Sequence, residues 1–129
     1  MRVLMAEDNA VNMLIAVAML ERWGVQVQQA QDGREAIAAV QRAAVAGQPF
    51  HAILMDVQMP VMSGHDATRA LRQMPAGQGL PIVALTAAAL VTERDEALRA
   101  GMDDFLTKPI DADKLHAALL RYRVLPVAG

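Results

Sequence analysis

Short, nearly continuous apolar runs alternate with longer helical patterns along this sequence. We expect five strands, at residues 2–6, 25–28, 51–55, 82–85 and 104–107. The run at 25–28 alternates apolar and polar residues, which indicates a strand with one solvent-exposed face, as at the edge of a sheet. Because a helical segment follows each strand, the pattern predicts an α/β fold with a doubly wound parallel sheet covered on both faces.

Caps and breakers place the helices between these strands. We expect helices at residues 11–23, from about 33 to 47, from about 64 to 74, 92–100 and 111–122. The expected N-caps include Asp32, Ser63 and Thr92. Glu35 follows Asp32 at capping-box spacing, and Gly24 and Gly101 stop two of the helices. The prolines and glycines of residues 75–81 predict a loop.

Composition narrows the class of protein. The 129 residues, 54% hydrophobic and 20% charged, fit one globular domain with a core at about residues 2–122. A net charge of −2 argues against broad contact with nucleic acid or an anionic membrane surface. The absence of cysteine excludes disulfides, thiol catalysis and cysteine metal sites. No apolar run could span a bilayer or form a signal peptide, so we expect a soluble, cytoplasmic chain, either complete or one domain of a longer protein.

Polar side chains stand at the ends of four of the five expected strands. Glu7 and Asp8 follow the first strand, Asp56 the third and Lys108 the fifth, and Thr86 ends the fourth. In a doubly wound sheet these carboxyl ends meet at the binding crevice. Three close carboxylates repel one another, and a cation that prefers oxygen ligands, Mg²⁺ or Mn²⁺, relieves this repulsion. The lysine and the hydroxyl then remain to hold an anion, which predicts a site for phosphoryl transfer.

Each of these residues has a plainer explanation when it is taken alone. The Glu7-Asp8 pair could be a solvated turn, Asp56 a cap, Thr86 a polar strand end and Lys108 an ordinary surface lysine. Their occurrence together, each at the carboxyl end of a strand, makes these separate explanations improbable.

At these strand ends the sequence resembles the receiver domain of response regulators, from Arg2 to about Tyr122. The motifs that carry the resemblance are Glu7-Asp8-Asn9, residues 55–60 (MDVQMP), Gly64, residues 84–87 (ALTA) and residues 101–109 (GMDDFLTKP). Residues 9–12 (NAVN), 55–60 and 102–110 are most similar to receivers attached to hybrid sensor histidine kinases. The resemblance implies a CheY-like, flavodoxin-like (βα)5 fold with strand order 2-1-3-4-5.

The resemblance also implies a role for each acidic residue. Asp56 is expected to be the phosphoacceptor, attacking phosphohistidine as a carboxylate nucleophile. Asp8 is expected to bind magnesium directly and Glu7 mainly through water. Asp56 and the backbone carbonyl of Gln58 complete the expected metal ligands, and Lys108 pairs with the phosphoryl oxygens.

A second group of residues is implied to act as the switch. Thr86 is expected to hydrogen-bond the phosphoryl group and move toward it, and Phe105 to swing inward into the vacated space. Ala87 completes the motif that contains Thr86, and the bond between Lys108 and Pro109 is expected to be cis. The implied readout face consists of the helix at 92–100, the strand at 104–107 and the helix at 111–122.

Four positions depart from the common pattern of the family. Phe105 stands where many receivers have tyrosine, so a readout through that hydroxyl is absent, and Ser63 replaces a common aspartate but can still cap its helix. Gln58 and Ala88 occupy positions that tune how fast water removes the phosphoryl group. None of these changes touches the acceptor, the metal acids or the lysine.

We therefore predict a receiver domain that takes a phosphoryl group from a histidine kinase or a histidine phosphotransfer domain. It uses the group as a switch or passes it to a histidine phosphotransfer domain, with slow self-dephosphorylation and no contact of its own with nucleic acid or membrane. Two other classes of protein are disfavoured. A haloacid-dehalogenase-type phosphohydrolase needs an aspartate where this chain has Gln58, and a flavin carrier needs a phosphate-binding loop where this chain has the acidic pair Glu7-Asp8. The remaining alternative is a non-phosphorylated interaction module. It predicts that the acidic residues are replaced or that the lysine is missing, whereas this sequence contains all of them.

The segment at residues 11–20 contains one polar residue, Asn12. Its plainer interpretation is a mostly buried central helix. The sharper hypothesis is that an exposed apolar part of it docks a helix that carries the donor histidine. His51, His65 and His116 lack metal-ligand spacing and are expected to be structural or surface residues.

Overall fold

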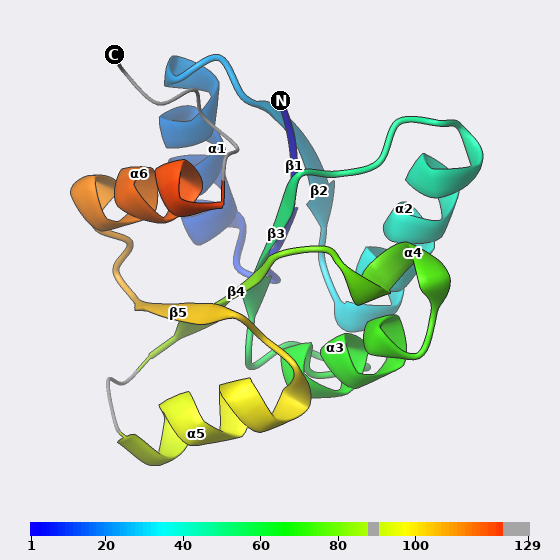
Figure 1. The fold of residues 1–129 in the computed structure, drawn as a ribbon. Coiled ribbons are helices and arrows are strands. Elements are labelled where there is room, and N and C mark those ends of the chain that lie inside the picture. The colour runs from blue at the N-terminus through cyan, green and yellow to red at the C-terminus, as the bar shows by residue number, and fades with distance from the viewer. Residues whose placement is uncertain (88–90, 123–129) are drawn as a thin grey trace.

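The computed structural model describes residues 1–87 and 91–122, whose strands form one parallel sheet (Figure 1). The strands lie in the order β2-β1-β3-β4-β5, and all four neighbouring pairs are parallel. Their bounds are β1 (Arg2–Ala6), β2 (Gln26–Ala30), β3 (Ala52–Asp56), β4 (Ile82–Thr86) and β5 (Asp104–Thr107). The predicted doubly wound, flavodoxin-like sheet and its strand order are confirmed, and β2 is an edge strand as its alternation indicated.

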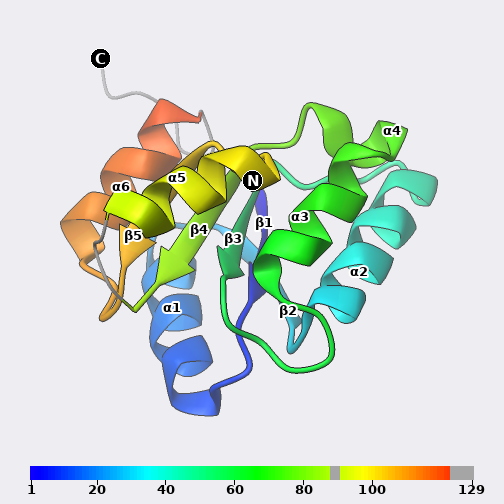
Figure 2. The same cartoon turned by 90° about the horizontal axis from the view of Figure 1, so that it is seen from below.

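Helices cover both faces of the sheet, as the end-on view shows (Figure 2). Their bounds are α1 (Ala10–Arg22), α2 (Gly33–Val45), α3 (Gly64–Arg72), α4 (Pro75–Gln78), α5 (Val91–Ala100) and α6 (Ala112–Arg121). Successive residues of a strand point to opposite faces, so Val3 and Met5 pack with α1 and α6, whereas Leu4 and Ala6 pack with α2 and α3. The two resulting apolar layers hold the carboxyl ends of the strands in fixed positions.

The loop predicted at residues 75–81 contains a short helix instead, α4. Pro75 occupies its first turn, where a missing N–H costs no hydrogen bond, so the proline starts this helix instead of breaking one. Gly77 packs so closely on α3 that an added Cβ would lie 2.2 Å from the carbonyl oxygen of Leu71. Tertiary packing therefore decides the structure of this segment.

The predicted helix caps are confirmed at two positions and wrong at a third. The side chains of Asp32 and Ser63 accept hydrogen bonds from the N–H groups of Glu35 and Asp66 at 2.9 and 3.1 Å. Glu35 itself reaches the N–H of Gln31, one residue before the cap, at 3.3 Å. Thr92 lies inside α5, which begins at Val91, so it is not the N-cap.

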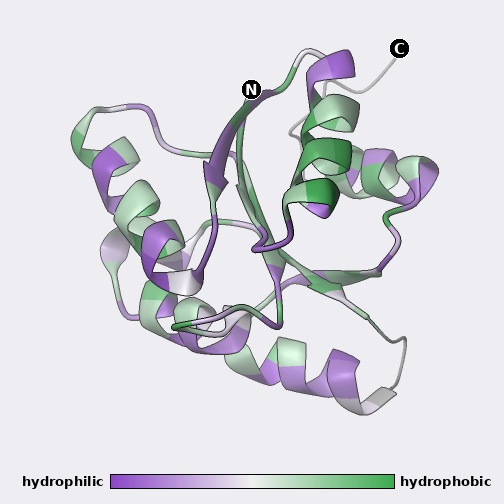
Figure 3. Ribbon diagram, turned by 180° about the vertical axis from the view of Figure 1, so that it is seen from behind, coloured by the Kyte–Doolittle hydropathy of each residue, from purple (hydrophilic) through white to green (hydrophobic). Residues whose placement is uncertain are grey.

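Helix α1 is less buried than its apolar sequence suggested. Met13, Ala16, Val17 and Leu20 face the sheet. Val11, Leu14 and Ile15 are 65%, 70% and 47% exposed, so the interpretation as a mostly buried helix is wrong for these three. Apolar colour extends along much of α1 in Figure 3. An apolar surface is thus available beside the carboxyl ends of β1 and β3.

The three histidines lie apart, as expected. His51 Nδ1 accepts a hydrogen bond from the N–H of Arg2 at 3.0 Å, and the ring of His116 packs edge-on against Trp23 at 5.0 Å. Among the described residues, no helix combines the length and the apolar character needed to cross a membrane. The cytoplasmic location stays a prediction.

Candidate active site

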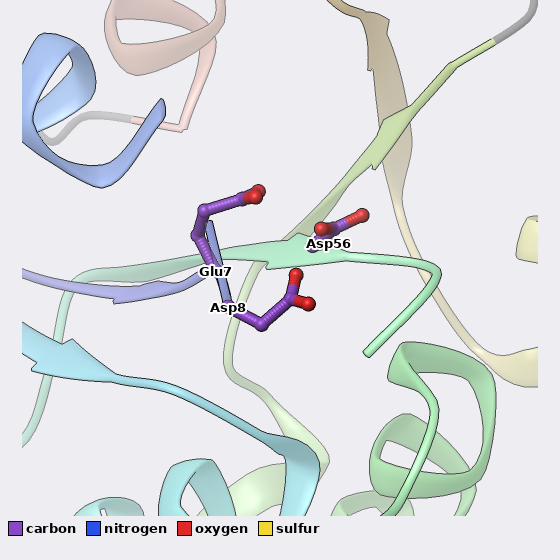
Figure 4. A group of neighbouring side chains, drawn as sticks. All are labelled: Glu7, Asp8 and Asp56. Carbon is purple, nitrogen blue, oxygen red and sulfur yellow. The ribbon is translucent and has the colours of Figure 1, made fainter. Parts of the chain in front are cut away.

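The side chains predicted at the strand ends meet in one cavity of about 300 Å³. The predicted residues that line it are Glu7, Asp8, Asp56, Gln58, Thr86, Ala87 and Lys108. Figure 4 shows the three carboxylates gathered at the ends of β1 and β3. Two predicted residues lie outside this lining: Phe105 packs against the core, and Pro109 lines a smaller neighbouring cavity with Glu7 and Lys108.

Lys108 lies between two buried carboxylates. Its Nζ is 2.7 Å from Asp56 Oδ2 and 2.9 Å from Glu7 Oε2, and these two acidic side chains are only 5% and 1% exposed. Burial raises the pKa of Asp56 to about 6, while Lys108 opposes this rise and the charge of Glu7 adds to it. Asp56 is therefore an aspartate that holds its proton unusually well, yet it is mostly ionised at neutral pH.

The other two members of this cluster stay charged. Burial alone would raise the pKa of Glu7, but the nearby Lys108 ammonium and the hydrogen bond from the N–H of Asn9 outweigh burial and leave that pKa below its ordinary value. Burial would lower the pKa of Lys108, but its interactions with the carboxylates of Asp56 and Glu7 raise it instead. The lysine is thus a fixed positive charge at the base of the cavity.

Two asparagines of the first loop and helix fix the Glu7 side chain. Glu7 Oε1 accepts hydrogen bonds from the backbone N–H of Asn9 at 3.2 Å and from Asn12 Nδ2 at 3.4 Å. Asn9 also caps α1, since its side chain accepts hydrogen bonds from the N–H groups of Val11 and Asn12. The sequence motif contained both asparagines, but their action on Glu7 depends on the turn between β1 and α1.

The acidic cluster suits a hard divalent cation. Carboxylate oxygens of Glu7, Asp8 and Asp56 all lie within 4.8 Å of one another. Glu7 Oε2 is buried without an aligned hydrogen bond in the described part of the chain, although the Lys108 ammonium is near, so it has capacity for another ligand. Oxygen-only donors are what Mg²⁺ prefers. These residues therefore fit magnesium. Asp8 is exposed, so the cluster is open to solvent at this residue.

Gly64 allows the loop after β3 to fold back over the end of that strand. An added Cβ at this position would lie 2.2 Å from the backbone oxygen of Asp56. The N–H of Gly64 donates to the carbonyl of Val57 at 2.9 Å, and the N–H of Gln58 donates to Asp56 Oδ1 at 3.2 Å. Glycine is required here for close approach, a reason that the motif alone did not reveal.

The predicted switch residues contact the first turn of α5. Thr86 is buried, and its Oγ1 donates a hydrogen bond to Glu93 Oε2. The guanidinium of Arg94 lies 5.7 Å from the ring centroid of the half-buried Phe105. Sequence reasoning placed Glu93 only near a helix cap and missed this contact, because the partners meet through the packing of α5.

The remaining predicted features are in place where the structure describes them. The peptide bond between Lys108 and Pro109 is cis, as the resemblance implied, and the N–H of Lys108 donates to the carbonyl of Thr86 at 2.8 Å. Ala87 is exposed at the cavity. Ala88 lies outside the described residues.

Comparison with known proteins gives the family. The model of the response regulator receiver domain family matches residues 3–120. This chain therefore belongs to the response regulator receiver domain family, as its motifs and fold indicated, and it is a receiver domain of phosphorelay signalling.

The similar proteins include receivers of histidine kinases. The chain is 42% identical over 124 residues to the sensor histidine kinase GacS of Pseudomonas protegens, covering 94% of this chain and 13% of GacS. The receiver domain of the sensor histidine kinase PA1611 from Pseudomonas aeruginosa is 40% identical with a TM-score of 0.84, covering 94% of this chain and 95% of that one. Its structure has a magnesium ion coordinated in the active site cleft. The predicted similarity to receivers of histidine kinases is confirmed.

A second similar structure contains a bound partner. It is the co-crystal structure of the Saccharomyces cerevisiae histidine phosphotransfer protein Ypd1 with the receiver domain of its downstream response regulator Ssk1. The similarity is 30% in sequence, with a TM-score of 0.83, and covers 95% of this chain and 88% of that one.

Proposed function

We propose that Asp56 accepts a phosphoryl group from a phosphohistidine of a partner protein. A carboxylate oxygen of Asp56 forms the new P–O bond as the P–N bond to the histidine breaks, and the imidazole nitrogen keeps the electron pair. The pKa of about 6 leaves Asp56 mainly in the nucleophilic carboxylate form at neutral pH. The observation that most supports the proposal is the position of Asp56, buried at the end of β3 and paired with Lys108.

The neighbouring residues supply the positive charge and the donors that the transferred group needs. Lys108, 2.7 Å from Asp56, would pair with phosphoryl oxygens, and Thr86, which lines the same cavity, would donate its hydroxyl to them. Glu7, Asp8, Asp56 and the backbone carbonyl of Gln58 would hold Mg²⁺. When bound, this ion would neutralise the charge that develops on the transferred group. The α5–β5–α6 surface is the proposed readout.

The proposed partner is a histidine kinase or a histidine phosphotransfer domain. The Ssk1 receiver is bound to such a phosphotransfer protein in the similar structure, and the charge of this chain does not suggest nucleic acid. Val11, Leu14 and Ile15 are the exposed apolar side chains of α1. Ile15 lines a small cavity with Glu7 and Lys108, and Leu14 lines another with Glu7 and Asp8, so both adjoin residues of the site that contains Asp56. We propose that this α1 face docks the helix carrying the donor histidine.

Replacing Ile15 with glutamate tests both the donor and the docking face. We expect transfer from a phosphorylated histidine phosphotransfer protein to slow at least about tenfold, because a charge would be buried at the apolar contact. Phosphorylation by acetyl phosphate, which needs no docking, should stay near the wild-type rate. The measurement is the rate of labelled phosphoryl transfer from each donor.

The matched control is Val45→Glu, at an apolar residue that is 90% exposed on α2, away from the proposed docking face. Its transfer rates from both donors should equal those of the wild type. Equal slowing by both substitutions, or none by Ile15→Glu, would remove the α1 face from the proposal. No transfer to the wild type from any histidine donor would contradict the phosphohistidine step itself.

A further inference from the structure

The first turn of α5 contributes a side chain to the site. Glu93, in this turn, lines the same cavity as Asp56 and Lys108. Its Oε2 accepts the hydrogen bond from the hydroxyl of Thr86, a side chain only 6% exposed. A hydroxyl that donates to a carboxylate forms a charge-assisted bond, which is stronger than a bond between neutral groups. Thr86 is therefore held by a fourth carboxylate that sequence reasoning did not place in the site.

The hydroxyl of Thr86 has one proton to donate. While Glu93 accepts that proton, it cannot also be donated to an oxygen on Asp56. A phosphoryl group on Asp56 adds strong acceptor oxygens to the same cavity. The Glu93 carboxylate and the phosphoryl group are thus alternative acceptors for one donor, and the donor must change partners when Asp56 is modified.

The same turn of α5 also contacts the other switch residue. Arg94, adjacent to Glu93, places its guanidinium 5.7 Å from the ring centroid of Phe105. Neighbouring side chains of one helical turn therefore touch both Thr86 and Phe105. A change of partner at Thr86 is in this way linked to the position of α5 and to the surface around Phe105.

We infer that Glu93 is a positioning residue that competes with the phosphoryl group for the Thr86 hydroxyl and so stabilises the unphosphorylated arrangement of the switch. The inference rests on the proposed function of Asp56 as acceptor. Because the bond from Thr86 to Glu93 must break before Thr86 can bond the phosphoryl group, Glu93 sets how strongly modification of Asp56 shifts the switch.

The test is the affinity of the chain for beryllofluoride, a phosphoryl analogue, in excess Mg²⁺, measured by titration of backbone amide NMR signals. Glu93→Ala removes the competing acceptor and should tighten binding about tenfold, the size expected for one hydrogen bond to a charged group. Glu93→Gln keeps a side-chain oxygen that can accept the Thr86 hydrogen bond. Its affinity for beryllofluoride should therefore lie close to that of the wild type. Glu96→Ala, one turn further along α5, removes a similar charge and should bind as the wild type does.

A double-mutant cycle with Thr86→Val separates this inference from simple charge repulsion. If Glu93 acts through the hydroxyl, Glu93→Ala should have no effect on affinity in the Thr86→Val background. If the carboxylate merely repels the anion, Glu93→Ala and Glu93→Gln should tighten binding equally, with or without Thr86, which would overturn the inference. Unchanged affinity in Glu93→Ala would overturn it as well. A wild-type chain that does not bind beryllofluoride at all would contradict the proposed function, and with it the competitor that this inference requires.

Discussion

Replacing Arg72 with alanine is expected to lower the free energy of unfolding by about 3 kcal/mol, because several partly buried carbonyl groups would lose their donor. The Arg72 side chain is only 18% exposed. It donates to the carbonyl oxygens of Gly101 at 2.9 Å and Leu80 at 2.8 Å, and also to that of Gly77. It pairs with Asp103 at 3.0 Å. One guanidinium thus joins α3 to the segment before β4 and to the turn before β5. Urea denaturation measures its contribution.

The same helix offers a matched control. Arg69 is 57% exposed and forms an ion pair only with Asp66, three residues earlier, among the interactions that the described residues show. Arg69→Ala should change stability by no more than about 0.5 kcal/mol, as for other exposed helical pairs. Arg72→Lys should remain well below the wild type, because a single ammonium cannot reach carbonyls that the planar guanidinium spans. Similar losses for Arg69→Ala and Arg72→Ala would contradict this account of the network.

Replacing Asp56 with asparagine is expected to stabilise the metal-free protein at neutral pH. The pKa of Asp56 is about 6 in the native state and has an ordinary value of 3.8. The native state therefore binds the proton of Asp56 more tightly than the unfolded chain does. As the pH rises from about 4 to above 6, the wild type loses the corresponding stability and Asp56→Asn does not. The expected advantage of Asp56→Asn is about 2–3 kcal/mol at pH 7.5 and close to zero at pH 4.

The measurement is urea denaturation of both proteins in EDTA across this pH range. Asp95→Asn, at an exposed position of α5, is the control and should differ little from the wild type at any pH. An advantage of Asp56→Asn that stays constant with pH would mean that the buried carboxylate does not resist ionisation. A stability advantage of Asp56→Asn that grows as the pH falls would mean that the pKa of Asp56 is lowered in the native state, not raised.

The sequence predicted the site well because its residues stand at ends of strands. Once five apolar runs are taken as parallel strands, topology alone brings Glu7, Asp8, Asp56 and Lys108 to one edge, and the structure places all four in one cavity. The cap of α3 was also predictable, because Ser63 and Asp66 interact within one turn. Local patterns and strand topology were sufficient for these features.

The features that sequence reasoning missed depend on packing between distant segments. Proline and glycine at residues 75–81 indicated a loop, but packing of Gly77 on α3 supports the short helix α4. The contact of Glu93 with Thr86 and the network of Arg72 require the final placement of α5 and β5. The exposed part of α1 could not be separated from its buried part, because both are apolar in sequence.

Phosphorylation of Asp56 is expected to require the bound metal ion. The most direct measurement is intact mass after incubation with acetyl phosphate and Mg²⁺, for the wild type and for Asp56→Asn. We predict a gain of one phosphoryl group in the wild type, no gain in Asp56→Asn, and loss of the wild-type gain in EDTA. No gain in folded wild-type protein, or the same gain in Asp56→Asn, would contradict phosphorylation of Asp56; the former result would favour a receiver-like module that signals without phosphate.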